Sequence, residues 1–383
     1  TAMAMPKMAW AEIMPKQPSG NGTAGSPYQI RTAAELYWFA ALVKGDTSVS
    51  GVSSANTGAC ATLSADIDFG TENFSLIGTS ETNLYEGTFD GNGYSIIVNQ
   101  NSSTDLAIFG YIGTCTIRNL TVKGTINASG KYAAGFAMHK YGTGTATIEK
   151  CISDVKIESY VDGDGTHAGI IAVVDAGPLN ISNSAFTGSI NGSSTNSCGG
   201  FIGYSKGTSN ITNSYISATF GISTTSCNIA SRGSNVSVTN CYYVNDLGGV
   251  LTGMTKVSAG QMKSGEVAYL LNESVSDGTQ AWFQNLSVEG GDAYPILKNS
   301  GSNTVYGAEI VCVGNIVSKS FSNSQISNAV YDTHDYDGNG FCSRGCYQPA
   351  TLTTDQHDIN GDGQNDEVYE IGNAGQLYWF AAL

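Results

Sequence analysis

The sequence predicts an all-β fold: a right-handed parallel β-helix (a β-solenoid) with short capping helices at each end, followed by a small β-rich spacer. Three observations support this fold class: an irregular short repeat, a charge-poor and glycine-rich composition, and a fifteen-residue stretch that occurs twice. Charged residues make up 13% of the chain, against about 25% in an ordinary soluble protein. With 48 glycines among 383 residues, this composition is typical of many short strands joined by turns.

The short repeat occupies the middle of the chain. Residues 116–126, 147–157, 180–190 and 210–220 share one template, and residues 237–244 form a shortened fifth copy. The first apolar residues of the copies, at spacings of 31, 33, 30 and 27, are Ile117, Ile148, Ile181, Ile211 and Val238. Two positions later stand Asn119, Lys150, Asn183, Asn213 and Asn240. We expect each coil to stack its apolar residue on the next one, and the amides to form a ladder at a corner.

The duplicated stretch, at residues 28–42 and 369–383, predicts a strand, a turn and a short helix. Ten of its fifteen positions are identical in the two copies. Thr32 with Glu35, and Asn373 with Gln376, have the spacing of a capping box at a helix start. Leu36, Phe39, Ala40 and Val43 then follow at the spacing of one helical face.

A β-solenoid has open ends whose unpaired strand edges must be covered. We therefore expect the helix at 32–43 to cap the first coil. The second copy lacks coils of its own, so its Tyr378-Trp379-Phe380 face should be partly exposed or packed on a neighbour.

These patterns divide the chain into four predicted parts. The parts are a linker-like segment at 1–19, a β-helix module at 20–298 with helices at 32–43 and 258–272, a β/loop spacer at 299–350, and a calcium-type loop with the start of a second module at 351–383.

Two acidic loops in the C-terminal part predict metal sites. Asp358, Asn360, Asp362 and Asp366 follow the D-x-N-x-D-G-x-x-D spacing of a calcium loop, in which alternate side-chain oxygens converge on a hard cation. Tyr369 stands where an EF-hand would need its last acidic ligand, so a structural calcium hairpin is predicted instead. A weaker form of the pattern consists of Asp335, Asp337 and Asn339.

The nine cysteines indicate neither a zinc site nor a disulfide framework clearly. His334, Cys342, Cys346 and His357 could supply four zinc ligands, but the three-residue gap between the cysteines is wide for a zinc knuckle, so zinc is not expected. A Cys342–Cys346 disulfide is an alternative, and Cys60 could pair with Cys227. Most other cysteines stand alone in strand-like runs, where they are predicted to be small buried hydrophobes: Cys115, Cys151, Cys198, Cys241 and Cys312.

One group could support catalysis. It consists of Asp162, Asp164, His167 and Asp175, which lie close together in the sequence, with His139 and Lys140 expected one coil away. Hydrolases and lyases with a β-helix fold need such grouped acids and bases. The aspartates also read as an exposed turn. The chain contains no H-E-x-x-H helix and no G-x-S-x-G elbow.

A family resemblance rests on a series of segments in order. They are GNGTAGSPYQIRTAAELYWFAALV, ADIDF, GTFDGNGYSI, IFGYIG, GGFIGYSKG and SAGQMKSGEVAYLLN. Over residues 10–298 the chain resembles the GLUG-motif β-helix modules of bacterial cell-surface proteins, which recur in gut Firmicutes and are found attached to M26-type immunoglobulin A peptidases. The resemblance implies an extracellular repeat or adhesive region, at the cell surface or secreted. Met138 and His139 depart from the motif's Gly-Tyr and predict an altered face on that coil.

Taken together, the sequence predicts a non-enzymatic extracellular stalk or adhesion module, whose partners would be a glycan, a host surface protein or adjacent modules of the same polypeptide. A carbohydrate-active enzyme using Asp162, Asp164 and His167 is the alternative. The net charge of −15 and the absence of a Lys/Arg run argue against nucleic acid and anionic membranes as partners.

Overall fold

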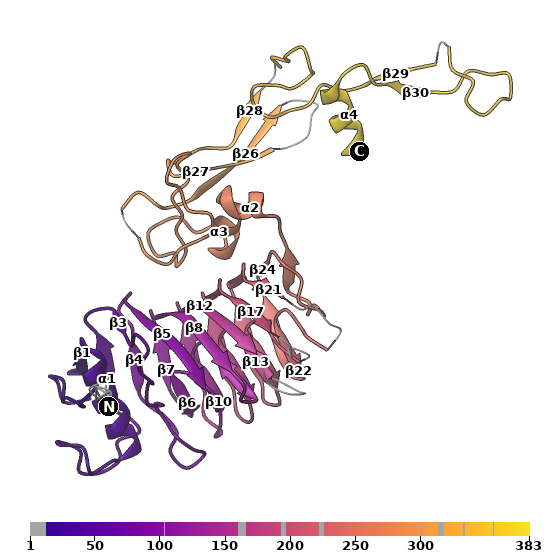
Figure 1. Cartoon of the computed structure of the whole chain (residues 1–383). Helices are drawn as coiled ribbons and strands as arrows, with labels where there is room; N and C mark the ends of the chain where they lie inside the picture. Colours follow the sequence, from indigo (N-terminus) through magenta and orange to yellow (C-terminus); the bar gives the residue numbers. More distant parts are fainter. Residues whose placement is uncertain are drawn as a thin grey trace, which may run out of the picture. The chain divides into compact units, whose positions relative to one another are not determined.

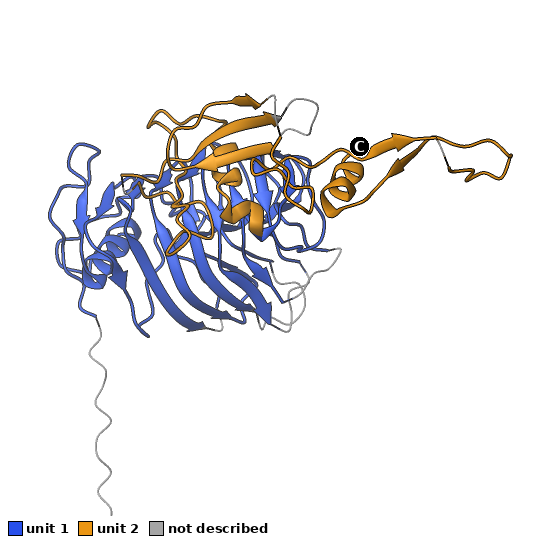
Figure 2. Ribbon diagram, turned by 90° about the horizontal axis from the view of Figure 1, so that it is seen from above, with its two compact units in different colours: residues 1–259 blue, residues 260–383 orange. Residues whose placement is uncertain are grey.

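The structure is a computed structural model that describes residues 13–102, 104–159, 166–192, 197–221, 226–299, 301–312, 318–331, 334–354 and 356–383. The chain forms two compact units, Thr1–Ala259 and Gly260–Leu383 (Figure 2). The boundary predicted at residue 298 lies inside the second of these units. No helix among the described residues is long and apolar enough to cross a membrane.

The first unit is a parallel β-helix built from three sheets, which confirms the predicted fold (Figure 1). One sheet contains β1 (Tyr28–Ile30), β2 (Ala61–Leu63), β4 (Thr88–Asp90), β7 (Thr116–Arg118), β11 (Ala146–Glu149), β15 (Leu179–Ser182), β19 (Ser209–Thr212) and β23 (Val236–Thr239). A second contains β6 (Phe109–Ile112), β10 (Ala137–Lys140), β14 (Ile171–Val174), β18 (Ile202–Ser205) and β22 (Ser231–Gly233).

The third sheet contains β3 (Ile67–Asp68), β5 (Ser95–Ser102), β8 (Thr121–Ala128), β12 (Ile152–Ser159), β16 (Ala185–Phe186), β17 (Ser189–Gly192), β20 (Tyr215–Ile216), β21 (Thr219–Phe220), β24 (Cys241–Tyr243) and β25 (Met254–Lys256). Two short strands, β9 (Tyr132–Ala134) and β13 (Thr166–Ala168), pair in parallel as a separate small sheet.

The predicted column of apolar residues forms the core of the β-helix. Residues paired in register along the first sheet are Phe89, Ile117, Ile148, Ile181, Ile211 and Val238. All six are buried. Each coil therefore stacks its apolar side chain on those of its neighbours, as expected for a stacked repeat.

The corner after each of these strands depends on a left-handed backbone. The five corner residues Asn119, Lys150, Asn183, Asn213 and Asn240 have φ between 46° and 51°. Asparagine adopts this conformation more readily than most residues, so the repeated amide selects the turn. Part of the predicted ladder also forms, since Asn240 Nδ2 donates to Asn213 Oδ1 at 2.9 Å.

Helix α1 (Ala33–Lys44) covers the first coil, as the duplicated stretch predicts (Figure 1). The Thr32 side chain accepts a hydrogen bond from the backbone N–H of Glu35 at 3.2 Å and caps the helix. Phe39 is fully buried and packs edge-on against Tyr85 and Phe89, with ring centroids 6.1 and 6.0 Å away. The helix thus closes the end of the apolar column.

The second unit contains β26 (Tyr306–Cys312), β27 (Ser318–Ser322), β28 (Ala329–Tyr331), β29 (Thr351–Thr353), β30 (Val368–Glu370) and α4 (Ala374–Ala381). The predicted helix at 258–272 is instead two short helices, α2 (Ala259–Lys263) and α3 (Glu266–Leu271), because Gly265 between them has a φ of 88°. The Asn272 side chain donates to Trp282 O and accepts from Trp282 N, and Gln284 Nε2 donates to Met262 O. These bonds tie both helices to residues of the second unit, which is why the unit begins near residue 260.

Helix α4 has the same capping pattern as helix α1, but its apolar face is more exposed. Asn373 accepts from the backbone N–H of Gln376 at 2.8 Å, so the predicted cap forms here too. Phe380, however, is 46% exposed, whereas the equivalent Phe39 is fully buried. Tyr378 packs against Phe341 and Tyr347 of the spacer, with ring centroids 5.7 and 5.4 Å away. The partly exposed apolar face predicted for this copy is confirmed.

Candidate functional site

The described members of the predicted catalytic group do not act together. Asp162 and Asp164 lie outside the described residues. His167 lies in β13 and is fully buried, with Nε2–H donating to Gly130 O at 3.1 Å. Burial lowers the pKa of its imidazole, so it is neutral and closed to a substrate.

Asp175 is bound elsewhere. One of its carboxylate oxygens lies 2.7 Å from His139 Nδ1, and the other lies 3.5 Å from Lys206 Nζ. The structure therefore pairs Asp175 with His139, which the sequence placed only one coil away, rather than with His167.

His139 belongs to a group of rings that we call the tyrosine cluster: Tyr111, Tyr132, His139 and Tyr141. Tyr111 stacks on His139 with ring centroids 4.8 Å apart and an interplanar angle of 15°, and it stacks on Tyr141 at 5.9 Å. Tyr132 meets His139 edge-on at 4.6 Å. His139 is buried among the three tyrosines, which are half-buried, so the cluster presents aromatic surface that its own contacts hold in place.

Acidic groups surround the tyrosine cluster. Burial raises the pKa of Tyr141, and so do its hydrogen bond to Glu81 and the charge of Asp175. Burial also raises the pKa of Tyr111, with further contributions from Asp105, Glu81 and Asp175. Tyr111 and Tyr141 therefore keep their phenolic protons near neutral pH, and the site combines aromatic faces, hydroxyl donors and carboxylate acceptors.

Lys140, next to His139, has a structural role. It pairs in register with Ile112 and Val174, both of which are core residues, and it is fully buried. Its ammonium donates to Tyr141 O at 2.7 Å, to Gly142 O at 3.0 Å and to Ala176 O at 3.2 Å. Burial lowers the pKa of the ammonium, and the three carbonyls satisfy its donors. It is thus placed to hold a corner rather than to transfer a proton.

The sequence pointed to His139 but not to the three tyrosines. The residues pair within the second sheet, where Tyr111, His139, Val173 and Tyr204 are in register across β6, β10, β14 and β18. Tyr132 begins β9 and Tyr141 follows β10, and their approach to His139 depends on the coil geometry.

The predicted calcium loop is exposed and folded around its own acidic side chains. Asp358 accepts backbone hydrogen bonds from Gly361 at 2.7 Å and from Gly363 at 3.0 Å. Asp366 accepts from the N–H and the side-chain amide of Asn360 at 3.2 and 3.0 Å. The carboxylates point into the loop. Calcium binding stays a prediction, because the carboxylates of the loop do not form one of the close ligand groups found among the described residues.

The weaker acidic pattern forms a turn. Asp337 Oδ1 accepts from Asn339 N at 2.8 Å and from Phe341 N at 3.0 Å, while Asp335 and Asp337 are both exposed. Asn339 O accepts from Gly375 N at 2.7 Å, which joins this turn to the start of α4.

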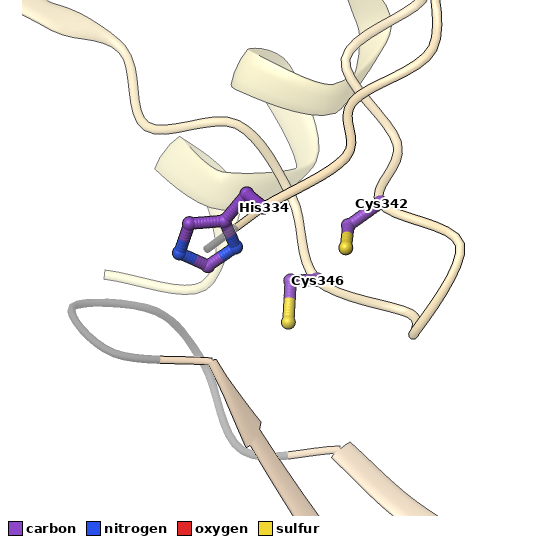
Figure 3. A group of neighbouring side chains, drawn as sticks. All are labelled: His334, Cys342 and Cys346. Carbon is purple, nitrogen blue, oxygen red and sulfur yellow. The ribbon is translucent and has the colours of Figure 1, made fainter. Parts of the chain in front are cut away.

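Three of the four residues considered for zinc do meet, and we call them the His/Cys cluster: His334, Cys342 and Cys346 (Figure 3). Their ligand atoms all lie within 4.8 Å of one another, and both cysteines are buried. His357 is not part of the cluster; it is half-buried, and its Nε2 lies 3.1 Å from Glu370 Oε1.

The two cysteines of this cluster differ in oxidation state. Cys346 is disulfide-bonded, whereas Cys342 forms no disulfide, so the alternative Cys342–Cys346 bond is wrong. Burial raises the pKa of the Cys342 thiol, but hydrogen bonds from Arg344, Asp335 and His334 outweigh it and lower the pKa to about 6. Arg344 Nη1 lies 3.7 Å from the sulfur.

The remaining described cysteines follow the sequence prediction in part. Cys115, Cys151, Cys198 and Cys241 are buried and form no disulfides, as expected for small core residues. Cys60 is not bonded to Cys227. The side chain of Cys312 lies outside the described residues.

No protein-family model and no curated protein matches the sequence. Among solved structures, the chain is similar to one described as the crystal structure of a "putative immunoglobulin A1 protease from Bacteroides ovatus", with 17% sequence identity and a TM-score of 0.48. The similarity covers 75% of this chain and 95% of that chain. A likeness at this level assigns no activity, so the resemblance to GLUG-motif modules stays a prediction.

Proposed function

We propose that the chain is a non-enzymatic β-solenoid module of a modular bacterial protein that works outside the cell, and that it adheres to carbohydrate. The GLUG-like segment order supports this biological setting. The observation that carries the adhesion proposal is the tyrosine cluster on the β-helix.

The tyrosine cluster suits a sugar because it offers both kinds of contact that a sugar needs. The half-buried rings of Tyr111, Tyr132 and Tyr141 can pack against the C–H face of a pyranose, since aromatic side chains combine apolar surface with a polar end. Glu81 and Asp175 lie beside those rings as acceptors for sugar hydroxyls. The stacking on His139 fixes the rings before a ligand arrives, which lowers the entropy cost of binding.

The enzyme alternative has less support. It needs His167 to reach a substrate together with two aspartates, and the imidazole of His167 is buried against Gly130. An adhesive surface needs no such convergence.

A glycan array with the full chain tests the proposal. We expect binding to a restricted set of glycans, and we expect Tyr111→Ala to weaken it by about 2 kcal/mol, or about thirtyfold, the loss typical of a central aromatic contact. Tyr204→Ala is the matched control, because Tyr204 lies in the same sheet but packs against Arg232 instead, with the guanidinium 5.3 Å from the ring centroid.

Two results would contradict adhesion through this cluster. One is a glycan affinity that falls equally in the Tyr111 and Tyr204 variants. The other is a complete lack of glycan binding by a chain that retains its β-helical circular dichroism.

We also propose that Ca²⁺ stiffens the C-terminal loop through Asp358, Asn360, Asp362 and Asp366. Alternating oxygen donors and the two loop glycines support this role. The ion would be structural, ordering the segment that leads into β30 and α4.

A further inference from the structure

The His/Cys cluster supports an inference that goes beyond adhesion. We propose that, once the disulfide at Cys346 is reduced, His334, Cys342 and Cys346 bind Zn²⁺, so that this part of the second unit alternates between a disulfide form and a zinc form.

The geometry of the cluster is close to that of a zinc site. A tetrahedral ion about 2.3 Å from each sulfur and about 2.1 Å from nitrogen sets its ligand atoms roughly 3.5–3.8 Å apart. The three ligand atoms here already lie within 4.8 Å of one another, about 1 Å more than such an ion requires.

The backbone holds the two cysteines on one side of a tight turn (Figure 3). Gly345 N donates to Cys342 O, and Cys342 N donates to Cys346 O, both at 2.8 Å. Gly345 has a φ of 88°, a conformation that glycine adopts without strain, and this lets the turn close over a three-residue gap. That gap made zinc unexpected from the sequence.

Elements from outside the turn bring in the histidine. The His334 ring stacks on Tyr336 at 5.0 Å, and Tyr336 forms a bridge with Cys342, which places the imidazole beside the thiol. Arg344 lies over the ring of Tyr331 at 4.1 Å and faces the Cys342 sulfur, where its positive charge favours the thiolate that a metal requires.

The donor set selects the metal. Two sulfurs and an imidazole suit Zn²⁺, whereas Ca²⁺ requires oxygen ligands.

The change between the two forms is chemically balanced. A dithiol reductant supplies two electrons and two protons to the S–S bond at Cys346, closes to its own disulfide, and leaves two cysteine thiols. Zn²⁺ then binds the thiolates, and their protons pass to solvent. Oxidation by a disulfide donor reverses the sequence and expels the ion.

Cobalt titration tests the proposal with a spectroscopic readout. The full chain is stripped with chelator, reduced with a phosphine, which does not compete for metal as a thiol would, and titrated with Co²⁺. We expect one equivalent to produce a thiolate charge-transfer band and tetrahedral d–d bands, which Zn²⁺ abolishes by displacement. Unreduced protein should give neither band.

The variants have matched controls. His334→Ala and Cys342→Ser should lower Co²⁺ affinity by more than about tenfold, the loss caused even by residues that only orient a metal ligand. His357→Ala and Cys60→Ser should bind like the wild type, because neither residue belongs to the cluster.

A second measurement uses only the wild-type chain, so it does not depend on a variant that folds. Reduced protein is alkylated with and without Zn²⁺, and each cysteine is quantified by mass spectrometry. Protection of Cys342 and Cys346 but not Cys60 supports the proposal. Equal labelling with and without Zn²⁺, no Co²⁺ spectrum after reduction, or an equal loss in the His334 and His357 variants overturns it.

Discussion

The corner at Lys150 allows the energetic contribution of one backbone angle to be measured. Four of the five equivalent corners hold asparagine, and Lys150 adopts the same left-handed conformation with a φ of 50°. We predict that Lys150→Asn raises the stability of the first unit. A left-handed residue with an ordinary side chain costs about 1–2 kcal/mol, and asparagine recovers part of this.

The magnitude follows from the structure. A gain of about 1 kcal/mol in the free energy of unfolding corresponds to a rise in Tm of about 2–4 °C for a unit of this size. The new amide would also lie between Asn119 and Asn183, where it could extend the hydrogen bond seen from Asn240 to Asn213. Lys150→Gly relieves the same strain but gains less, because glycine loses more backbone entropy on folding.

Thermal and urea unfolding, monitored by circular dichroism, measure the effect. Lys156→Asn is the control for lost charge, since Lys156 is also exposed but lies within β12. Asn183→Lys is the reverse change and should destabilise by a similar amount. The reasoning fails if Lys150→Asn is no more stable than Lys156→Asn, or if Asn183→Lys has no cost.

Three further predictions concern caps, protons and calcium. Phe39→Ala should lower the free energy of unfolding of the first unit by about 3–5 kcal/mol, because Phe39 is fully buried. Phe380→Ala, in the half-exposed copy, should cost less than about 1 kcal/mol. Urea titrations measure both losses, and equal losses would contradict the capping assignment. Because the folded pKa of His167 lies below its unfolded value near 6.5, its stability contribution is present above pH 6.5 and is lost as pH falls below it, with a slope of at most about 1.4 kcal/mol per pH unit. His167→Gln should flatten the slope and His357→Gln should not. Ca²⁺ should slow proteolysis at residues 358–366, and Asp358→Ala should abolish that protection; an unchanged cleavage rate on chelation would leave the loop a simple turn.

The sequence was informative where contacts are repeated or local. The spacing of Ile117 and its equivalents determined the core column, because each coil packs only on the next one. The capping boxes of α1 and α4 involve side chains three residues from their partners, so they could be predicted directly.

Sites formed by distant residues were harder to predict. Asp175 lies 36 positions from His139, and the sequence did not show which histidine it would bind. The His/Cys cluster depends on a left-handed Gly345 that closes an unusually wide gap. The division near residue 260 depends on side-chain bonds from Asn272 and Gln284, which no periodicity encodes.

The duplicated helix has a practical consequence for measuring unfolding. Seven consecutive residues, LYWFAAL, are identical at 36–42 and 377–383, yet Leu36 is 4% exposed and Leu377 is 55% exposed. An antibody fragment raised against this heptapeptide would find one reachable epitope per folded chain, in the C-terminal copy. Loss of the solenoid's first coil would uncover the other. The binding stoichiometry would then rise from one to two and count opened solenoids directly.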